Sequence, residues 1–344
     1  MNSQKPLIEI RTGSDSDIPK IRAAYDFLKS MNIPFSPRIL SAHRTPKIMA
    51  QEAQKLSENG FLVSIAAAGG SAHLPGMTAS ETLIPLVGLP VKTTNLEGQD
   101  SLYSIIQMPD GVPVGSVAAG QSESAAIVAA QIAYHNNPEV RNRIRAYRGL
   151  EGEIASEIPT VPLVGIVKPS GIKVDEKKYR EMMVLMEEFG LKVTEYQLSV
   201  IDFNGVKVIS REMEDNGTMA VIALGALADE DTTNYFPGFI AESTDLPTIG
   251  LPITRSFAGS DFYIKGDIFQ SMLSFSEPGE ETRGYPVAGM GINRYTNAAL
   301  YAAQIAGLFI PKVQEKVRVY RNTLAEAVKD KDARIQAEGI EAFL

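Results

Sequence analysis

The 344-residue sequence contains no cysteine and no tryptophan, and only 3 histidines. Without cysteine the chain has no disulfide framework, no thiolate nucleophile and no thiolate metal ligand. Its apolar runs are too short to cross a bilayer, and residues 1–6 lack the apolar stretch of a signal peptide. We therefore expect a cytoplasmic protein that does not bind membranes.

An excess of positive charge is also missing. Lys and Arg number 33 against 41 Asp and Glu, which gives a net charge of −8 and a pI near 5.2. This balance argues against a general nucleic-acid binder, and an anionic substrate would need a locally basic pocket. Hydrophobic residues make up 44% of the chain, as in soluble globular proteins, and the length allows two ordinary domains.

Short apolar runs alternate with helical patterns along the first part of the chain. The sequence predicts strands at 7–11, 35–40, 61–67, 86–91 and 112–117, and helices at 18–31, 47–57 and 124–134. This alternation is typical of an α/β fold whose parallel sheet is covered on both faces. Ligands of such folds bind in loops beyond the carboxyl ends of the strands.

The pattern then restarts. The segment PLVGLPV at 85–91 is echoed by PTIGLPI at 247–253, and AAQIA at 129–133 recurs at 302–306. Echoes in the same order indicate a duplication. We predict two tandem flavodoxin- or Rossmann-like three-layer domains with parallel sheets. Residues 1–158 would be the catalytic domain, including a charged linker helix, and residues 159–344 a degenerate structural repeat. We expect the charge run 139–153 to be a solvated helix, and His135 to be a solvated residue at a helix end.

Three unusual loops follow predicted strands of the first copy, at 13–17, 41–46 and 68–76. In the second loop His43 is an acid/base group for neutral pH, and the adjacent Arg44 suits a phosphate. Pro46 could occupy the first turn of a helix that Thr45 caps. The matching points of the second copy hold no histidine or arginine, so we place the site in the first copy.

Four runs carry a resemblance to a known family: GSDSD (13–17), SAHRTP (41–46), AGGSAHLPGM (68–77) and DSLYSIIQMPDGVPVG (100–115). Through them, residues 6–135 closely resemble the catalytic subunit of the class I phosphoribosylaminoimidazole carboxylases, the N5-carboxyaminoimidazole ribonucleotide (N5-CAIR) mutases of purine synthesis. Residues 160–310 resemble the family as a diverged second copy. The run 121–125 departs from the family's Gly-Ala-x-Asn-Ala stretch, which concerns assembly more than chemistry.

The resemblance implies conversion of N5-CAIR to 4-carboxy-5-aminoimidazole ribonucleotide (CAIR), through decarboxylation, CO2 trapping and carboxylation of C4, with no cofactor and no metal. It implies that His43 transfers the proton, and that His73 either acts directly or is structural. Ser14, Ser16 and Arg44 would bind the phosphate, and Asp17 the ribose. The full set of implied substrate-binding residues is Gly13, Ser14, Ser16, Asp17, Ser41, Ala42, Arg44, Ala68, Gly69, Gly70 and Leu74.

Simpler interpretations of the first loop stay open. Ser16 or Asp17 could merely cap the helix expected to start near Ile18, a helix that would itself offer backbone N–H groups and a positive dipole end to the phosphate. Asp15 and Asp17 could bind Mg²⁺, although two carboxylates make a sparse site.

Three other functions remain possible. The first is direct carboxylation of aminoimidazole ribonucleotide (AIR) by CO2, which would make the enzyme a carboxy-lyase. The others are a related carboxylase acting on another nucleotide, and a phosphometabolite-binding scaffold without turnover.

Members of the family are octamers of single-copy chains with sites at subunit contacts. The resemblance therefore implies a homotetramer of two-copy chains with one site per chain. Tyr235, Phe236 and Phe239 would help to wall a neighbouring pocket.

Overall fold

The computed structural model describes residues 5–92, 97–154, 161–199, 202–226, 235–254, 274–275 and 283–344. The first half holds strands β1 (Ile8–Thr12), β2 (Phe35–Ile39), β3 (Val63–Ala68), β4 (Leu86–Pro90) and β5 (Gly115–Ser116). Its helices are α1 (Arg22–Ser30), α2 (Pro46–Gln54), α3 (His73–Glu81), α4 (Gln99–Ile106), α5 (Ser122–Ala133) and α6 (Pro138–Arg148).

The second half repeats the order of the strands and of most helices. Its strands are β6 (Leu163–Pro169), β7 (Lys192–Leu198), β8 (Ala220–Ala226), β9 (Thr248–Ile253) and β12 (Val287–Gly289), with a separate short pair β10 (Ser274–Phe275) and β11 (Arg283–Gly284). Its helices are α7 (Glu176–Phe189), α8 (Phe203–Asp215), α9 (Phe236–Ser243), α11 (Tyr295–Gly307) and α12 (Pro311–Glu338), followed by a 3₁₀ turn, Ile340–Phe343.

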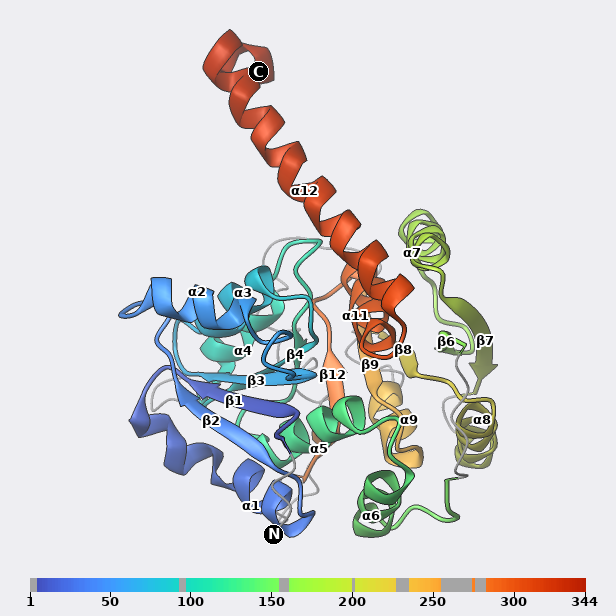
Figure 1. Ribbon diagram of the computed structural model, residues 1–344. Helices are drawn as coiled ribbons and strands as arrows, with labels where there is room; N and C mark the ends of the chain where they lie inside the picture. Colours follow the sequence, from blue (N-terminus) through green and yellow to red (C-terminus); the bar gives the residue numbers. More distant parts are fainter. Residues whose placement is uncertain are drawn as a thin grey trace.

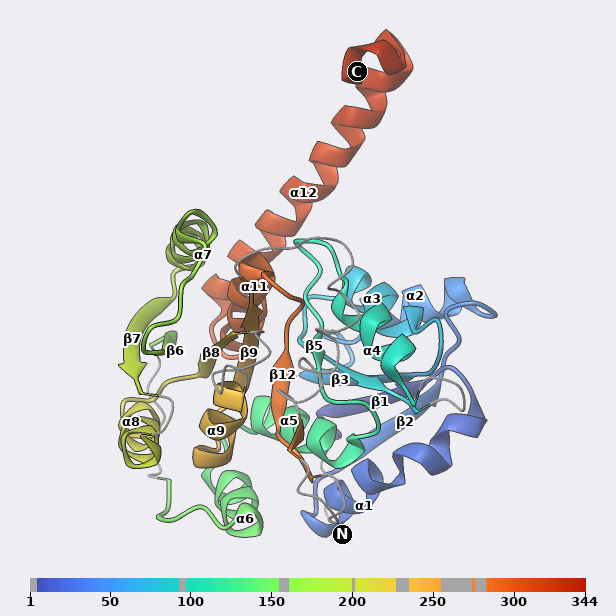
Figure 2. The same cartoon turned by 180° about the vertical axis from the view of Figure 1, so that it is seen from behind.

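One sheet of 10 strands runs through both halves, in the order β2-β1-β3-β4-β5-β12-β9-β8-β6-β7. Read inward from either edge, the two halves have the same strand order, as a duplication predicts. Neighbouring strands are parallel within each half, and β5 and β12 pair antiparallel through Ser116 and Gly289. The predicted α/β class is confirmed, but the two predicted sheets are joined into one (Figures 1 and 2).

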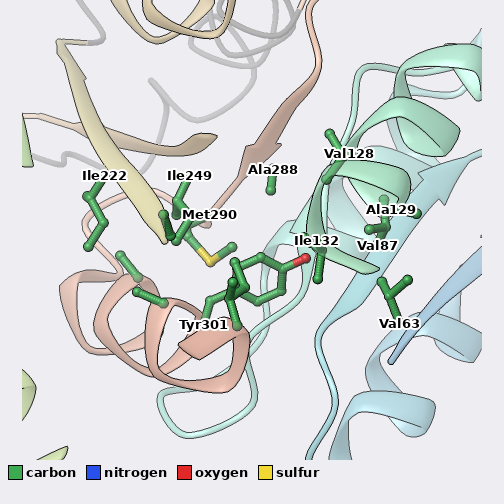
Figure 3. Close-up of a cluster of buried hydrophobic side chains, with 14 of the residues drawn as sticks. Val63, Val87, Val128, Ala129, Ile132, Ile222, Ile249, Ala288, Met290 and Tyr301 are labelled. Atoms are coloured by element: carbon green, nitrogen blue, oxygen red, sulfur yellow. The ribbon is translucent and has the colours of Figure 1, made fainter. Parts of the chain in front are cut away.

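Helices cover both faces of the sheet. Buried side chains of α1, α5, α7 and α11 belong to one apolar cluster on one face, and those of α2, α3, α4, α8 and α9 pack on the other. Figure 3 shows the first cluster crossing the junction: Ile132 of the first half lies beside Tyr301 of the second, with Val87 on the side of the first half and Ile249 on the side of the second. The hydroxyl of Tyr301 donates to the carbonyl of Leu86 at 3.1 Å, so the halves share a core.

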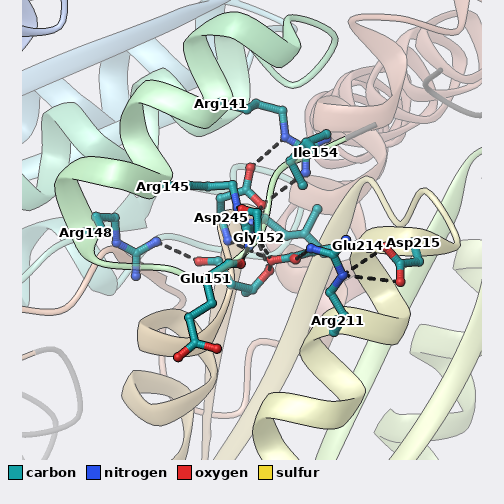
Figure 4. Close-up of polar contacts among 12 residues, drawn as sticks. Arg141, Arg145, Arg148, Glu151, Gly152, Ile154, Arg211, Glu214, Asp215 and Asp245 are labelled. Carbon is teal, nitrogen blue, oxygen red and sulfur yellow. Dashed lines mark hydrogen bonds and ion pairs between the residues drawn. The ribbon is translucent and has the colours of Figure 1, made fainter. Parts of the chain in front are cut away.

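Helix α6 is the element for which the sequence-based prediction fails most clearly. Arg141 and Arg145 are buried instead of solvated, and both bind Asp245 of the second half (Figure 4). The Arg141 guanidinium donates to both Asp245 oxygens, at 2.6 and 3.2 Å, and Arg145 reaches Glu214 at 2.8 Å. Burial opposes ionisation of Asp245, but the hydrogen bonds and charges of the two arginines outweigh it, and the pKa of this carboxyl lies below its usual value.

His135 is also buried, with 1% of its surface exposed, so the prediction of a solvated residue is wrong. Its ring lies 5.8 Å from that of Phe309, and neither ring nitrogen has a hydrogen-bond partner within the described part of the chain. Burial, followed by the charge of Arg141, lowers the pKa of His135 to about 3, against the opposing charge of Asp245. The imidazole is therefore neutral at neutral pH.

Helix α12 is 28 residues long and extends well beyond the body of the protein (Figure 1). Val313 and Val317 near its start are buried in the shared core, whereas Val319 and Val328 are exposed. In the ranges that the structure describes, no helix combines the length and apolar character needed to cross a membrane.

Candidate functional site

A cavity of about 230 Å³ lies beyond the carboxyl ends of β1, β2 and β3, where the three predicted loops converge. Eleven of the thirteen predicted site residues line it, and Ser71 is an additional lining residue. The lining residues are Gly13, Ser14, Asp17, Ser41, Ala42, His43, Arg44, Ala68, Gly69, Ser71, His73 and Leu74. Ser16 and Gly70 are the two predicted residues that do not line it.

Two histidines meet at this cavity. His43 follows β2, and His73 is the first residue of α3. Nε2 of His43 lies 2.8 Å from Nδ1 of His73, and the ring planes are 79° apart. One ring donates and the other accepts, depending on their tautomers. Both side chains are exposed, so the pair can exchange protons with a bound molecule.

The loop that carries His43 and Arg44 is closed by its own hydrogen bonds. Thr45 is the N-cap residue of α2 and Pro46 its first residue, as the sequence predicts, but the Thr45 hydroxyl does not cap the helix. It donates to the carbonyl of Ser41 and accepts from its N–H, both at 3.1 Å. The Ser41 hydroxyl accepts from the N–H of Arg44 at 3.1 Å. These bonds hold the backbone while the His43 and Arg44 side chains stay exposed.

The first loop differs from expectation. A seven-residue 3₁₀ helix, Asp15–Ile21, follows it, and regular α-helix begins only at Arg22. The capping residue is Ser14, which accepts from the N–H of Ser16 at 3.3 Å, so neither Ser16 nor Asp17 has that role. The hydroxyls of Ser14 and Ser16 lie 2.9 Å apart. Because no α-helix starts here, this loop offers side-chain hydroxyls, and not the expected α-helix dipole, to a ligand.

Ser101 is a supporting residue that the sequence did not indicate, although it lies in the run DSLYSIIQMPDGVPVG at 100–115. Its buried hydroxyl accepts from the N–H of Gly70 at 2.8 Å and lies 3.2 Å from the carbonyl of Val91, to which it donates. Gly70 has a φ of +64°, in the left-handed region that favours glycine. Ser101 of α4 therefore fixes the glycine loop at the cavity.

A buried ion pair lies in β1, next to α3. The Arg11 guanidinium donates to both carboxylate oxygens of Glu9, at 2.7 and 3.0 Å, and to the hydroxyl of Thr78 in α3 at 3.2 Å. Ser64 of β3 donates to Glu9 at 2.8 Å. The alternation of apolar and charged residues in Ile8–Thr12 is the sequence signal that could have indicated this pair.

The carboxylates of the first loop are not part of a larger ligand cluster. Among the described residues no three His, Asp or Glu side chains cluster as metal ligands, and Asp17 instead lies 3.7 Å from the ammonium of Lys20.

In the second half, Phe236 is fully buried in the core, so it cannot wall a neighbour's pocket as predicted. Residues 200–201 and 227–234, which include part of the second copy's loops, lie outside the described ranges.

Comparison with known proteins supports the resemblance. The family model described as AIR carboxylase matches residues 7–153 and 163–327. The N5-carboxyaminoimidazole ribonucleotide mutase of Synechocystis sp. is 46% identical over 148 residues, covering 43% of this chain and 84% of the relative. The mutase of Pyrococcus horikoshii is 46% identical over 147 residues, covering 43% and 83%. A crystal structure of Treponema denticola PurE has a TM-score of 0.39 at 26% identity, covering 42% of this chain and 90% of that one.

Proposed function

Because the chain belongs to the AIR carboxylase family, we propose that it is an N5-CAIR mutase, an isomerase of purine biosynthesis that produces CAIR. The observation that carries the proposal is the hydrogen-bonded pair of His43 and His73 beside Arg44 in one cavity. The mutases that match the first half of this chain support the choice of reaction.

The proposed reaction moves a carboxylate from nitrogen to C4 and a proton in the opposite direction. The N–C bond breaks and releases CO2 inside the site, and C4 then attacks this CO2 to form the C–C bond. The nitrogen gains one proton and C4 loses one. A single proton carrier can therefore serve both steps, and His43 takes this role. His73, 2.8 Å away, orients the His43 ring and can pass the proton on.

The phosphate and ribose are assigned to the first two loops. Ser14 and Arg44 line the cavity and offer hydroxyl and guanidinium donors to the phosphate, since charge-assisted hydrogen bonds from arginine suit its oxygens. Ser16 does not line the cavity, but its hydroxyl lies 2.9 Å from that of Ser14 and is proposed as a third donor. Asp17 accepts from the ribose hydroxyls. The backbone at 68–70 contacts the base and CO2, because glycines there allow a close approach.

Turnover of each imidazole substrate by the purified chain tests the proposal. A mutase converts N5-CAIR to CAIR without added bicarbonate and leaves AIR unchanged at low bicarbonate. A direct carboxylase, the alternative, consumes AIR in proportion to bicarbonate. Conversion of neither substrate, with ribonucleotide binding retained, would favour the phosphometabolite-binding scaffold or a carboxylase for another nucleotide.

We also propose that the chain forms a homotetramer with one site per chain. The cavity of about 230 Å³ is below the roughly 300–1,000 Å³ of usual ligand pockets, and neighbouring chains would complete its walls. Its rim residues His43, Arg44, Ser71 and His73 are exposed in the single chain. Light scattering and ligand stoichiometry test this assembly. A monomer, or two nucleotides bound per chain, would contradict it.

A further inference from the structure

The second half reaches the helix that begins with His73. Arg321 of α12 donates to the carbonyl oxygens of Ala79, Ser80 and Thr82, at the carboxyl end of α3. Its bond to Ala79 measures 2.9 Å. The last carbonyls of a helix have no partner inside that helix, and a cation there is favoured by the helix dipole. One guanidinium thus caps α3 from the other half of the molecule.

The first half likewise caps a helix of the second half with an arginine. Arg148, at the end of α6, donates to the carbonyl oxygens of Ala241 and Thr244, at the carboxyl end of α9. Arg148 and Arg321 occupy the same position relative to the repeated AAQIA segment, and α3 and α9 are the corresponding helices of the two copies. The two halves therefore exchange equivalent arginine caps.

Only one of these two caps acts on a helix with a functional group at its start. Helix α3 has 9 residues, which makes it a rod of about 13 Å, and its first residue is His73. Helix α9 begins at Phe236 after Tyr235, and it holds no histidine. A displacement of α3 along its axis would change the 2.8 Å contact between His73 and His43, whereas the same displacement of α9 would move no group of the site.

We propose that Arg321 is a positioning residue for the site: by capping α3 it sets the place of His73 against His43. The second half, which lacks the site's histidines, thereby contributes to the geometry of the first. The effect on turnover rests on the proposed mutase function, whereas the effect on the histidine contact does not. Arg11, which binds Thr78 of the same helix at 3.2 Å, supports α3 from within the first half.

The two arginines provide a matched pair of variants, Arg321→Met and Arg148→Met. Each removes one interhalf cap, so we expect similar losses of melting temperature. The chain has 3 histidines, so NMR signals of labelled imidazole rings can be assigned one by one. Arg321→Met should change the ring signals of His43 and His73, and Arg148→Met should leave both unchanged.

Turnover provides the second measurement. Misplacing a reacting group by about 1 Å can cost 10²-fold in rate, so we expect kcat of Arg321→Met to fall roughly 10- to 100-fold with little change in KM. Arg148→Met should keep the wild-type kcat. Arg321→Lys retains a cation that can reach the carbonyls, and should recover part of the loss.

Equal effects of the two Met variants on kcat and on the ring signals would overturn the proposal, because both caps would then be only structural. If Arg321→Met does not fold, the comparison of Arg321→Lys with Arg148→Lys decides by the same two measurements. If the wild-type chain shows no turnover, the mutase assignment fails, and the ring signals alone still decide whether Arg321 positions His73.

Discussion

The two halves of the molecule share their packing and differ in their chemistry. Both have the same strand order, and both receive an arginine cap from the other half. His43, His73 and Arg44 gather at the cavity of the first half, whereas α9 of the second half begins with the buried Phe236, preceded by Tyr235. Features that both halves share therefore belong to the scaffold, and features found in the first half alone are candidates for the site.

The Pro-Gly pair at the start of α3 and α9 shows how this separation works. A Cβ on Gly76 would lie 2.5 Å from the sulfur of Met108, and one on Gly238 would lie 2.4 Å from the ring of Tyr285. A side chain at position 238 would clash with the Tyr285 ring, and one at position 76 would have to displace the end of the Met108 side chain, so close packing favours glycine at both positions. Their presence in a half without the histidines indicates that this turn serves the fold and not the reaction.

Removal of the proposed proton carrier, His43, should give the largest difference between the two halves. We expect His43→Asn to fold normally and to lose roughly 10²- to 10⁴-fold in kcat, the usual contribution of a general acid/base. Ser170→Ala changes the loop after β6 in the second half and should retain full turnover. Steady-state kinetics of the two variants give the test. Near-native turnover of His43→Asn would remove His43 from the mechanism.

The second prediction concerns the buried charges between the halves. Asp245→Asn leaves Arg141 and Arg145 buried without their shared counterion, and breaking a buried pair in this way costs about 3–5 kcal/mol. Urea unfolding measures the loss. Glu139→Gln is the control, because the Glu139–Arg143 pair is exposed and should contribute at most ~1 kcal/mol. Equal stability losses would mean that the network does not hold the halves together.

Local structure of the first half was largely predictable from sequence, because its apolar runs and capping residues are local signals. The predicted strand at 61–67 corresponds to β3, and the helix predicted at 47–57 corresponds to α2, with Pro46 in its first turn. The sequence also predicts that the three loops lie together, because the strands of a parallel sheet end on one side. The pairing of His43 with His73 depends on the exact ring positions, which periodicity does not specify.

Long-range contacts were not predictable. The antiparallel junction of the sheet rests on two short strands, β5 and β12, that meet at Ser116 and Gly289. The charges of α6 look like a solvated surface because their partner, Asp245, lies 104 residues from Arg141. Arg321 reaches Ala79 across 242 residues for the same reason. To predict contacts between the halves, one must know how the two copies are arranged in space.

A third prediction tests the charge difference between the loops of the two halves. Arg44→Ala should weaken binding of the ribonucleotide by about 1.5–3 kcal/mol, the usual contribution of a hydrogen bond to a charged group. Binding of the dephosphorylated nucleoside should change little. Calorimetry with both ligands measures the difference, and Arg38→Ala, whose guanidinium already pairs with Glu52 at 2.9 Å, is the control. Equal losses for nucleotide and nucleoside would exclude a phosphate role for Arg44.

The smallest expected effect concerns the residue that follows α5 in the first half and its counterpart after α11 in the second half. His135 follows α5, and the repeat places Leu308 at the corresponding position after α11. Burial lowers the pKa of His135 to about 3, below the value of about 6.5 in an unfolded chain. As the pH falls below about 6.5, the unfolded chain therefore binds a proton that the folded chain cannot accept. Stability from this group is complete above that pH and is lost towards pH 3.

His135→Leu gives the first half the residue of the second and should remove this acid sensitivity. At pH 7 the two proteins differ only by packing. Between pH 7 and pH 5 the variant should gain about 2 kcal/mol of unfolding free energy relative to the wild type, because its unfolded state has no imidazole to protonate. Urea unfolding at both pH values measures the change, and the other titrating groups cancel in the difference. A constant difference between the two proteins at pH 7 and pH 5 would show that His135 is protonated equally in the folded and unfolded states.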